Sequence, residues 1–212
     1  MGLLKKMKLV KEAPKTSLIF ENLFPGKTFL DIDYDSPSDY VTKYWNKYKE
    51  LGKNSIVING TIFEIIIYTL FVREGLLPMY LQAKVAFIPN VEYDMIIYNK
   101  EVGPISISLK TSLRERRKQA DLEAIALKYV HRKSECYLIS MDEQEVNAAK
   151  QEIKEGCLLG LNNVILASSP EFDNFIRNLK KYPLTESGTV EVITSSKIVT
   201  SELIKQYGNN SK

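Results

Sequence analysis

The most regular alternation of apolar and polar positions lies at residues 105–110, where the chain reads Ile-Ser-Ile-Ser-Leu-Lys. Side chains that alternate in this way belong to a β-strand whose two faces meet different surroundings. Alternating runs at 80–87 and 93–98 precede it, each followed by a short stretch that contains Pro or Gly. Such short connections predict antiparallel neighbours, which places Asp94 beside Lys110 near the open end of a hairpin.

A period of three to four residues predicts helices on both sides of these strands. Tyrosines recur every fourth residue between Ser36 and Gly52, a stripe that suits the core, a subunit contact or base stacking. The helix expected over 62–73 is apolar all round, and Glu64 in its first turn either meets the helix dipole or faces an active site. Further helices are expected at 112–130, 142–154, 170–181 and from 200, and further strands at 135–140, 163–167 and 189–194.

The helix expected over 112–130 carries several kinds of side chain at helical spacing. Ser112 and Glu115 have the spacing of a capping box, so Glu115 is expected to cap the helix. The sequence predicts a polar stripe of Arg116, Gln119 and Glu123, an inward apolar stripe of Leu122, Ala126, Tyr129 and Val130, and an outward set of Arg114, Arg117, Lys118 and Asp121.

The order helix, three strands, helix, strand, helix, strand predicts the fold class. It is α/β (α+β), with a central mixed β-sheet flanked by helices. A chain of 212 residues is long enough to bury one core. The longest apolar run, 65–72, is too short to span a bilayer, so no membrane association is expected.

Composition narrows the classes of function. With only Cys136, Cys157 and His131 available, a zinc site, a disulfide framework or a histidine-based triad is not expected. We therefore expect an intracellular protein of the cytoplasm. The net charge is only +3, but lysines crowd residues 5–15 and basic side chains crowd residues 110–118. Two such clusters in a nearly neutral chain favour an anionic partner, although each also suits a solvated face.

Lys110 ends the polar face of the opening strand, where a lone ammonium would be costly to bury. Asp94 on the preceding strand and Glu123 on the following helix are its candidate partners. Carboxylates and a lysine gathered in this way can hold a hard divalent cation, position a water and stabilise negative charge. Ser108 stands about 6.6 Å from Lys110 on the same face, where a second carboxylate would be most convenient.

These elements resemble the PD-(D/E)xK nuclease superfamily, in particular the type II restriction endonucleases. The resemblance covers about 59–167 and rests on Asp94, on Ser108-Leu109-Lys110 in place of acid-x-Lys, and on the helix that follows. A subset of the family has Ser-x-Lys and moves the second carboxylate onto that helix, about a dozen residues past the lysine. Glu123 matches this position, and Glu64 resembles an acid that some members carry on the helix before the hairpin.

The resemblance implies a Mg²⁺-dependent, sequence-specific endonuclease that hydrolyses double-stranded DNA, a type II restriction enzyme of a restriction-modification system. Asp94 and Glu123 would bind the metal, Lys110 would position the water, Ser108 would add a hydrogen bond and Glu64 would support the metal shell. The basic start of the helix would contact DNA through Arg114, Arg116, Arg117, Lys118 and Gln119.

The implied organisation is a single nuclease domain over residues 1–212. Its catalytic core spans about 59–167, and 1–58 and 168–212 would serve DNA recognition or dimerisation. Because one site cuts one strand, a homodimer is the expected assembly, and one subunit of a two-chain enzyme is the alternative.

Other interpretations of the same residues stay open. Lys110 suits an edge-strand surface, Asp94 a strand start and Glu123 an exposed helix face, with Asp121 as the reserve for the second carboxylate. The runner-up function is a structure-specific repair or junction nuclease. Further alternatives are a non-catalytic DNA-binding subunit of a multi-chain restriction complex and a domain that serves a small molecule.

Overall fold

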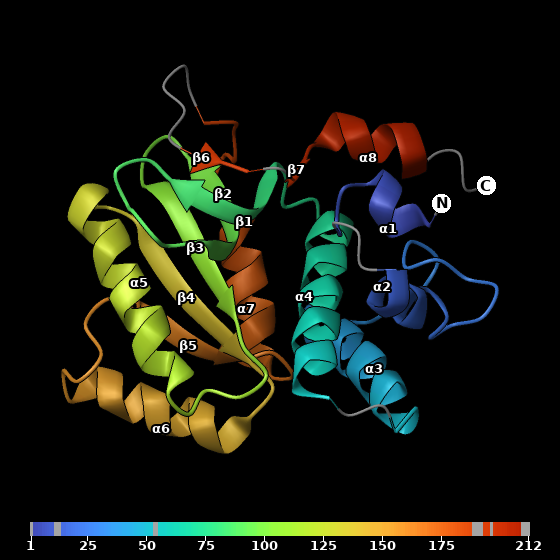
Figure 1. Cartoon of the computed structure of the whole chain (residues 1–212), viewed down its shortest axis with the longest axis horizontal. Helices are drawn as coiled ribbons and strands as arrows, with labels where there is room; N and C mark the ends of the chain where they lie inside the picture. Colours follow the sequence, from blue (N-terminus) through green and yellow to red (C-terminus); the bar gives the residue numbers. More distant parts are fainter. Residues whose placement is uncertain (1, 11–13, 53–54, 188–192, 196, 209–212) are drawn as a thin grey trace.

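A central β-sheet organises the computed structural model, which describes residues 2–10, 14–52, 55–187, 193–195 and 197–208 (Figure 1). Seven strands form the sheet in the order β5-β4-β3-β2-β1-β6, with β7 also pairing with β1. The strands are β1 (Met79–Val85), β2 (Tyr93–Asn99), β3 (Gly103–Leu109), β4 (Glu135–Ser140), β5 (Asn163–Leu166), β6 (Ile193–Thr194) and β7 (Lys197–Val199).

The sheet is mixed, as predicted. β1, β2 and β3 form an antiparallel meander, and β3, β4 and β5 are parallel to one another. β6 and β7 both pair with β1 in the antiparallel sense. The strand predicted at 189–194 is described only for its last two residues, since 189–192 lie outside the described residues.

Helices cover both faces of the sheet (Figure 1). On one face α5 and α6 bury Ala120, Leu127 and Val146 against the strands. On the other, α4 and α7 bury an apolar layer that includes Phe71 and Phe172. The helices are α1 (Leu3–Lys6), α2 (Pro14–Glu21), α3 (Pro37–Glu50), α4 (Ile56–Arg73), α5 (Arg116–Val130), α6 (Glu143–Lys154), α7 (Pro170–Leu179) and α8 (Ser201–Gly208).

The tyrosine stripe of α3 belongs to the core. Tyr40, Tyr44 and Tyr48 are at most 2% exposed, and Tyr40 donates a hydrogen bond to Thr69 on α4 (2.9 Å). Base stacking is therefore wrong for these rings, and so is a subunit contact. One apolar cluster contains Leu4 of α1 and Val199 of β7, so these two elements pack against the same core.

α4 is longer than predicted, because it begins at Ile56 rather than at Ile62. Ser55 caps it by accepting a hydrogen bond from the backbone N–H of Ile58 (3.2 Å). Glu64 therefore lies two turns into the helix, and its predicted interaction with the helix dipole in the first turn is wrong. Among the described residues, no helix is both long and apolar enough to cross a membrane.

α5 begins at Arg116, and the predicted capping box does not form. The side chain of Glu115 caps nothing, because a carboxylate from α6 fixes the preceding loop instead. Glu145 accepts hydrogen bonds from the backbone N–H groups of Leu113 and Arg114 and from the hydroxyl of Ser112. The loop that follows Lys110 is thereby tied to the first turn of α6.

Two of the side-chain orientations predicted for α5 are wrong. Asp121, expected to point outward, is 6% exposed, whereas Leu122 and Tyr129, expected to point inward, are 66% and 86% exposed. Asp121 is buried because its carboxylate accepts hydrogen bonds from the backbone N–H groups of Leu159, Gly160 and Leu161 (3.2, 2.7 and 3.1 Å). This contact attaches the α6–β5 loop to α5 and removes Asp121 from the set of candidate catalytic residues.

Replacing Asp121 by Ala should lower the free energy of unfolding by about 3 kcal/mol, because buried N–H groups would lose a charged acceptor. Gly160→Ala should also destabilise, since an added Cβ would lie 2.4 Å from the backbone oxygen of Asp121. Urea unfolding followed by circular dichroism measures both effects. Glu143→Ala, at an exposed position on α6, is the control and should change stability by less than roughly 0.5 kcal/mol.

Candidate active site

Asp94 and Lys110 form an ion pair between neighbouring strands, as the hairpin predicted. Lys110 follows the last residue of β3, and its backbone N–H donates to the carbonyl of Ile139 on β4 (3.1 Å). This extra bond continues the parallel pairing of β3 with β4 past the strand end. The ammonium Nζ lies 2.6 Å from Oδ2 of Asp94, and both side chains are only 14% exposed.

The carboxylate of Asp94 is held from two directions at the same oxygen. Oδ2 accepts a hydrogen bond from the backbone N–H of Leu109 (2.8 Å) as well as from Lys110. Within the described residues, Oδ1 makes no hydrogen bond to protein. One carboxylate oxygen is thus fixed by the fold, and the other is left without a protein donor among the described residues.

Glu64 brings a second carboxylate to this place from α4. Burial, together with repulsion from Asp94, raises the pKa of Glu64 to about 7, against the opposing effects of Lys110 and Lys197. Two carboxylates close enough to repel each other in a buried site disfavour double ionisation. A bound cation would remove that penalty, so the pair is suited to hold one.

Tyr68 connects α4 to the strand that carries Asp94. Its hydroxyl donates to the backbone carbonyl of Asp94 (3.0 Å) and lies 3.5 Å from both Oε2 of Glu64 and Nε2 of Gln82. Sequence reasoning missed Tyr68 and assigned it no role. The available signal was a tyrosine one turn after Glu64 in an otherwise apolar helix, where a buried hydroxyl needs a partner.

Glu123 approaches the same site from α5. Its carboxylate accepts a hydrogen bond from the side chain of Gln119 (2.7 Å), as the predicted polar stripe requires. Burial raises the pKa of Glu123, while Gln119 and Lys110 lower it and Asp94 raises it further. The hydroxyl of Tyr93, at the start of β2, donates to the backbone carbonyl of Glu123 (3.0 Å) and so fixes this turn of α5 beside Asp94.

Lys197 is a basic side chain that sequence reasoning did not connect with the site. It lies on β7, opposite Leu81 of β1, and is 8% exposed. Directly opposed residues of antiparallel strands point to the same face, so Lys197 shares the face that α4 covers. The positive charge of Lys197 lowers the pKa of Glu64. A strand of three residues, more than 85 residues after Lys110, offered no sequence signal for this contribution.

Ser108 occupies the strand position where the usual acid is missing. It is 6% exposed, and β3 pairs it with Leu138 of β4. The neighbours Ile107 and Leu109 belong to the apolar layer under α4, so the alternation predicted for this strand is present. The polar face of β3 is also buried, since Ser106 and Ser108 are only 4% and 6% exposed.

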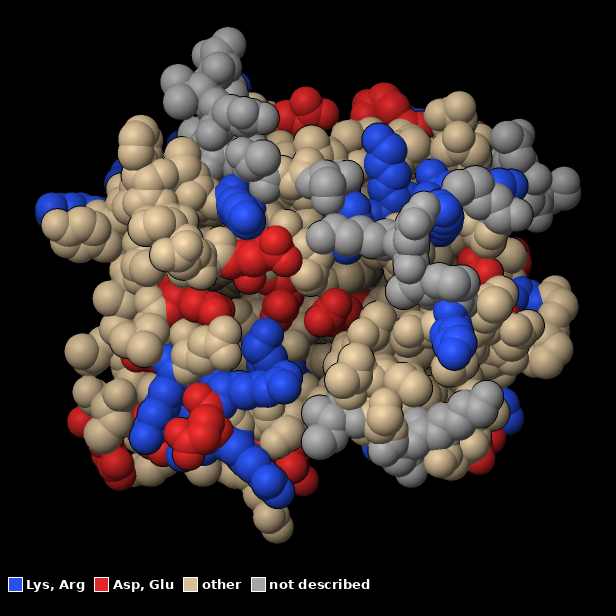
Figure 2. Space-filling model, in the orientation of Figure 1, with Lys and Arg blue, Asp and Glu red and all other residues tan. Residues whose placement is uncertain are grey.

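Basic side chains border the acidic site. Figure 2 shows acidic side chains in a hollow at the centre of this face, with lysine and arginine side chains below them, near the start of α5. Of the predicted DNA-contacting residues, Arg114, Arg116, Lys118 and Gln119 are exposed. Arg117 is instead less exposed and forms a bidentate ion pair with Glu152 of α6, with two hydrogen bonds of 2.8 Å each.

The donor set fits a hard divalent cation of the Mg²⁺ type. In the part of the chain that is described, no three His, Cys, Asp or Glu side chains are gathered as a ready ligand cluster. Mg²⁺ does not need one, because it is usually bound through one or two carboxylates and keeps several waters. Asp94 with its available oxygen, together with Glu64 or Glu123, supplies that number.

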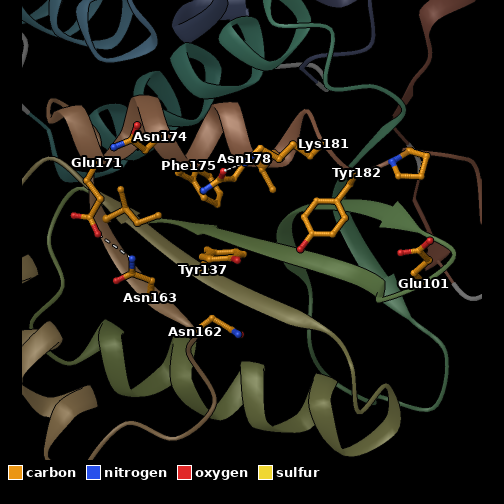
Figure 3. A pocket seen from close by; sticks show the side chains of 13 residues that line it. Glu101, Tyr137, Asn162, Asn163, Glu171, Asn174, Phe175, Asn178, Lys181 and Tyr182 are labelled. Carbon is orange, nitrogen blue, oxygen red and sulfur yellow. Dashed lines mark hydrogen bonds between the residues drawn. The ribbon is translucent and has the colours of Figure 1, made fainter.

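A separate cleft of about 740 Å³ lies at the opposite ends of the parallel strands (Figure 3). The rings of Tyr137, Phe175 and Tyr182 line it together with several asparagines, between α7 and the amino ends of β4 and β5. Glu171 lies at one end of the cleft, where its carboxylate accepts a hydrogen bond from the side chain of Asn163 (2.9 Å). Since Lys110 lies past the carboxyl end of β3, this cleft is no part of the candidate site.

Comparisons with known proteins support the fold. No family model and no curated protein matches the chain. One solved structure, titled "Restriction endonuclease PspGI-substrate DNA complex", is similar over 99% of this chain and 94% of that chain, with a TM-score of 0.51 and 17% sequence identity. At this identity the likeness shows a restriction-endonuclease-like fold, as predicted.

Proposed function

We propose that the chain is a Mg²⁺-dependent endonuclease that hydrolyses double-stranded DNA at a specific sequence. The observation that carries this proposal is the ion pair between Asp94 and Lys110 on adjacent strands, with Glu64 and Glu123 brought to it from two helices. The fold shared with a restriction endonuclease supports it, since that protein is described in complex with substrate DNA.

Each residue of the site would have a separate role in phosphodiester hydrolysis. Asp94 and Glu123 would hold the metal, and Glu64 would complete its surroundings from α4. A bound Mg²⁺ supplies a water of lowered pKa and neutralises charge on the phosphate. Lys110, fixed by Asp94, would donate hydrogen bonds to the attacking water and the phosphate oxygens. Arg114, Arg116 and Lys118 would contact the DNA backbone, where each neutralised phosphate adds a salt-dependent contribution to affinity.

We propose that the second carboxylate of the site comes from α5 and not from β3. Ser108 would contribute a hydrogen bond, and Glu123 would supply the carboxylate that the strand lacks. Gln119 supports this assignment because it already orients Glu123. The second copy needed to cut both strands would come from a homodimer.

Digestion of mapped plasmid DNA tests the function. The expected result is a discrete set of fragments with Mg²⁺ and none with EDTA. Cutting confined to branched DNA would favour a junction nuclease, and intact DNA of every form would contradict the proposal. Because phosphate contacts release counterions, cleavage below substrate saturation should also weaken steeply with added salt.

Metal binding can be measured without any cleavage. Mg²⁺ should raise the melting temperature, because a ligand of the folded state at ten times its Kd adds about 1.4 kcal/mol of stability. Asp94→Asn should abolish the shift, since it removes a ligand charge. Glu92→Gln, an exposed carboxylate two residues earlier, should keep it. An unshifted wild-type protein, or equal shifts in both variants, would contradict the metal assignment.

A further inference from the structure

The cleft beside α7 has the size and the lining of a ligand site. Its volume of about 740 Å³ lies within the range of small-molecule pockets, roughly 300–1,000 Å³. In Figure 3, the ring of Tyr137 lies between the amides of Asn178 and Asn162. Tyr182 and Glu101 lie towards the other end of the cleft. The proposed nuclease chemistry uses none of these side chains.

Both tyrosine rings of the cleft are fixed by the same carboxylate. Glu135, at the start of β4, accepts a hydrogen bond from the hydroxyl of Tyr137 at Oε2 (2.8 Å) and from that of Tyr182 at Oε1 (2.7 Å). The segment that carries Tyr182 is tied to the end of β2, because the side chain of Asn99 donates to the carbonyl of Pro183 (3.1 Å). Rings that are fixed before a ligand arrives lose little conformational freedom when it binds.

Tyr182 provides the open ring face. Tyr137 already packs against Phe175, with the ring centroids 4.7 Å apart. No aromatic ring of the described residues packs against Tyr182, which is partly exposed. A ring with a free face can stack on a flat heterocycle such as a nucleobase, because every base presents a π-face.

The asparagine amides present donors to the cleft. The amide oxygen of Asn178 accepts a hydrogen bond from Lys181 (2.8 Å), and that of Asn162 accepts one from the backbone N–H of Cys136 (2.9 Å). In the described part of the chain, neither amide nitrogen has a partner. Each nitrogen therefore has two N–H groups available, and a ligand that satisfies them must carry acceptors.

Glu101 provides an acceptor at the other end of the cleft. It is exposed in the turn between β2 and β3, and within the described residues its carboxylate has no hydrogen-bond partner. Burial and the hydrogen bond to Glu135 raise the pKa of Tyr182 to about 12, and the charge of Glu101 contributes, so Glu101 lies near this ring. A carboxylate with both oxygens available can accept two parallel N–H groups from one ligand.

We propose that the cleft binds a free guanine nucleoside, with the base stacked on Tyr182. Guanine has acceptors at O6 and N7, which suit the asparagine amides. Its N1–H and N2–H groups lie side by side and form the pair of donors that the carboxylate of Glu101 can accept. The cleft lies at the end of the parallel strands opposite to Lys110, so this site is additional to the proposed nuclease site.

Other ligands of similar size suit the cleft less well. Adenine offers a carboxylate only its N6 amino group beside an acceptor nitrogen, so its edge does not match Glu101. A sugar can satisfy the amides through its hydroxyl groups, but it has no planar pair of N–H donors. Among the described lining residues, the carboxylates of Glu101 and Glu171 outnumber the single ammonium of Lys181, which disfavours an anionic ligand.

Isothermal titration calorimetry of the whole chain with guanosine, without DNA or metal, tests the proposal independently of cleavage. Guanosine should bind at one saturable site. Adenosine should bind on the order of 10-fold more weakly, the scale of a lost hydrogen bond to a charged group. Maltose should give no heat of binding. Absence of guanosine binding at millimolar concentration, equal affinity for adenosine, or a preference for the sugar would overturn the proposal.

Glu101→Gln tests how the base is selected. Glutamine keeps the shape of the side chain but replaces one acceptor oxygen by a donor. The affinity for guanosine should therefore fall on the order of 10-fold while that for adenosine stays the same, whereas a damaged fold would lower both. Glu92→Gln, an exposed carboxylate outside the cleft, is the matched control and should bind like wild type. An unchanged preference for guanosine in Glu101→Gln would rule out the guanine assignment.

Two substitutions of Tyr182 separate stacking from the hydrogen bond to Glu135. Tyr182→Phe and Tyr182→Leu both lose the hydroxyl, but only phenylalanine keeps a flat ring. The Leu variant should bind guanosine at least roughly tenfold more weakly than the Phe variant, since stacking on an aromatic ring contributes on this scale. Thermal unfolding should show both variants folded. Equal guanosine affinities in the two variants would contradict a base stacked on Tyr182.

Discussion

Asp94→Asn should lower the rate of DNA cleavage on the order of 10³-fold, the scale seen when a preorganised charged group is lost from an active site. The substitution keeps the shape of the side chain and removes its charge. It would deprive the metal of a ligand and leave Lys110 without its counter-ion in a place where both side chains are only 14% exposed. Single-turnover cleavage at saturating enzyme measures the chemical step directly.

A control variant and a second active-site variant should be measured beside Asp94→Asn. Glu92→Gln removes an exposed carboxylate close to Asp94 and should cut at the wild-type rate. Lys110→Met should be as inactive as Asp94→Asn, and the double variant should be little worse than either, because residues that act as a unit are not additive. Equal cleavage by wild type and Asp94→Asn, with both proteins folded, would place the active site elsewhere.

The hairpin that carries the site could be predicted because its determinants are local. Alternation over 105–110 and short connections to 93–98 define the strands and their antiparallel order. Register then follows from which side chains need burial, so the pairing of Asp94 with Lys110 required no tertiary information. The mixed sheet follows in the same way from the order of elements.

The faces of α5 could not be predicted, because an apolar stripe has the same period whether it meets the core or solvent. Leu122 and Tyr129 looked like core residues, yet the small side chains of Ala120 and Ala124 are the ones packed against the sheet. Asp121 looked solvated and is buried, since its three N–H donors come from a loop almost 40 residues later. Apolar residues that the fold leaves exposed cannot be told from core residues by periodicity alone.

The supporting residues of the site were hidden for a related reason. Tyr68 and Lys197 reach Asp94 and Glu64 through tertiary packing of α4 and β7, and neither has a motif around it. Glu64 itself was proposed, but with a helix start misplaced by six residues, because Ser55 is the cap and Asn59-Gly60 lies inside the helix. Contacts between distant segments determine such details.

Glu123→Gln should abolish cleavage as fully as Asp94→Asn. The amide keeps the hydrogen-bonding capacity of the side chain towards Gln119, so the position of α5 should not change. Its loss of charge removes the second carboxylate of the site, since Ser108 cannot bind a divalent cation with comparable strength. Ser108→Ala should therefore reduce the rate by less than roughly tenfold, the equivalent of one ordinary hydrogen bond.

The ratio between these variants decides which carboxylate completes the site. If Glu123→Gln cuts well and Glu64→Gln does not, the second ligand comes from α4 and the displaced motif is wrong. If Ser108→Asp restores cleavage to Glu123→Gln, the strand position and the helix position are interchangeable sources of the same charge. That rescue should occur, because Ser108 lies on β3 two residues before Lys110, and a carboxylate there would meet the same cation as Asp94.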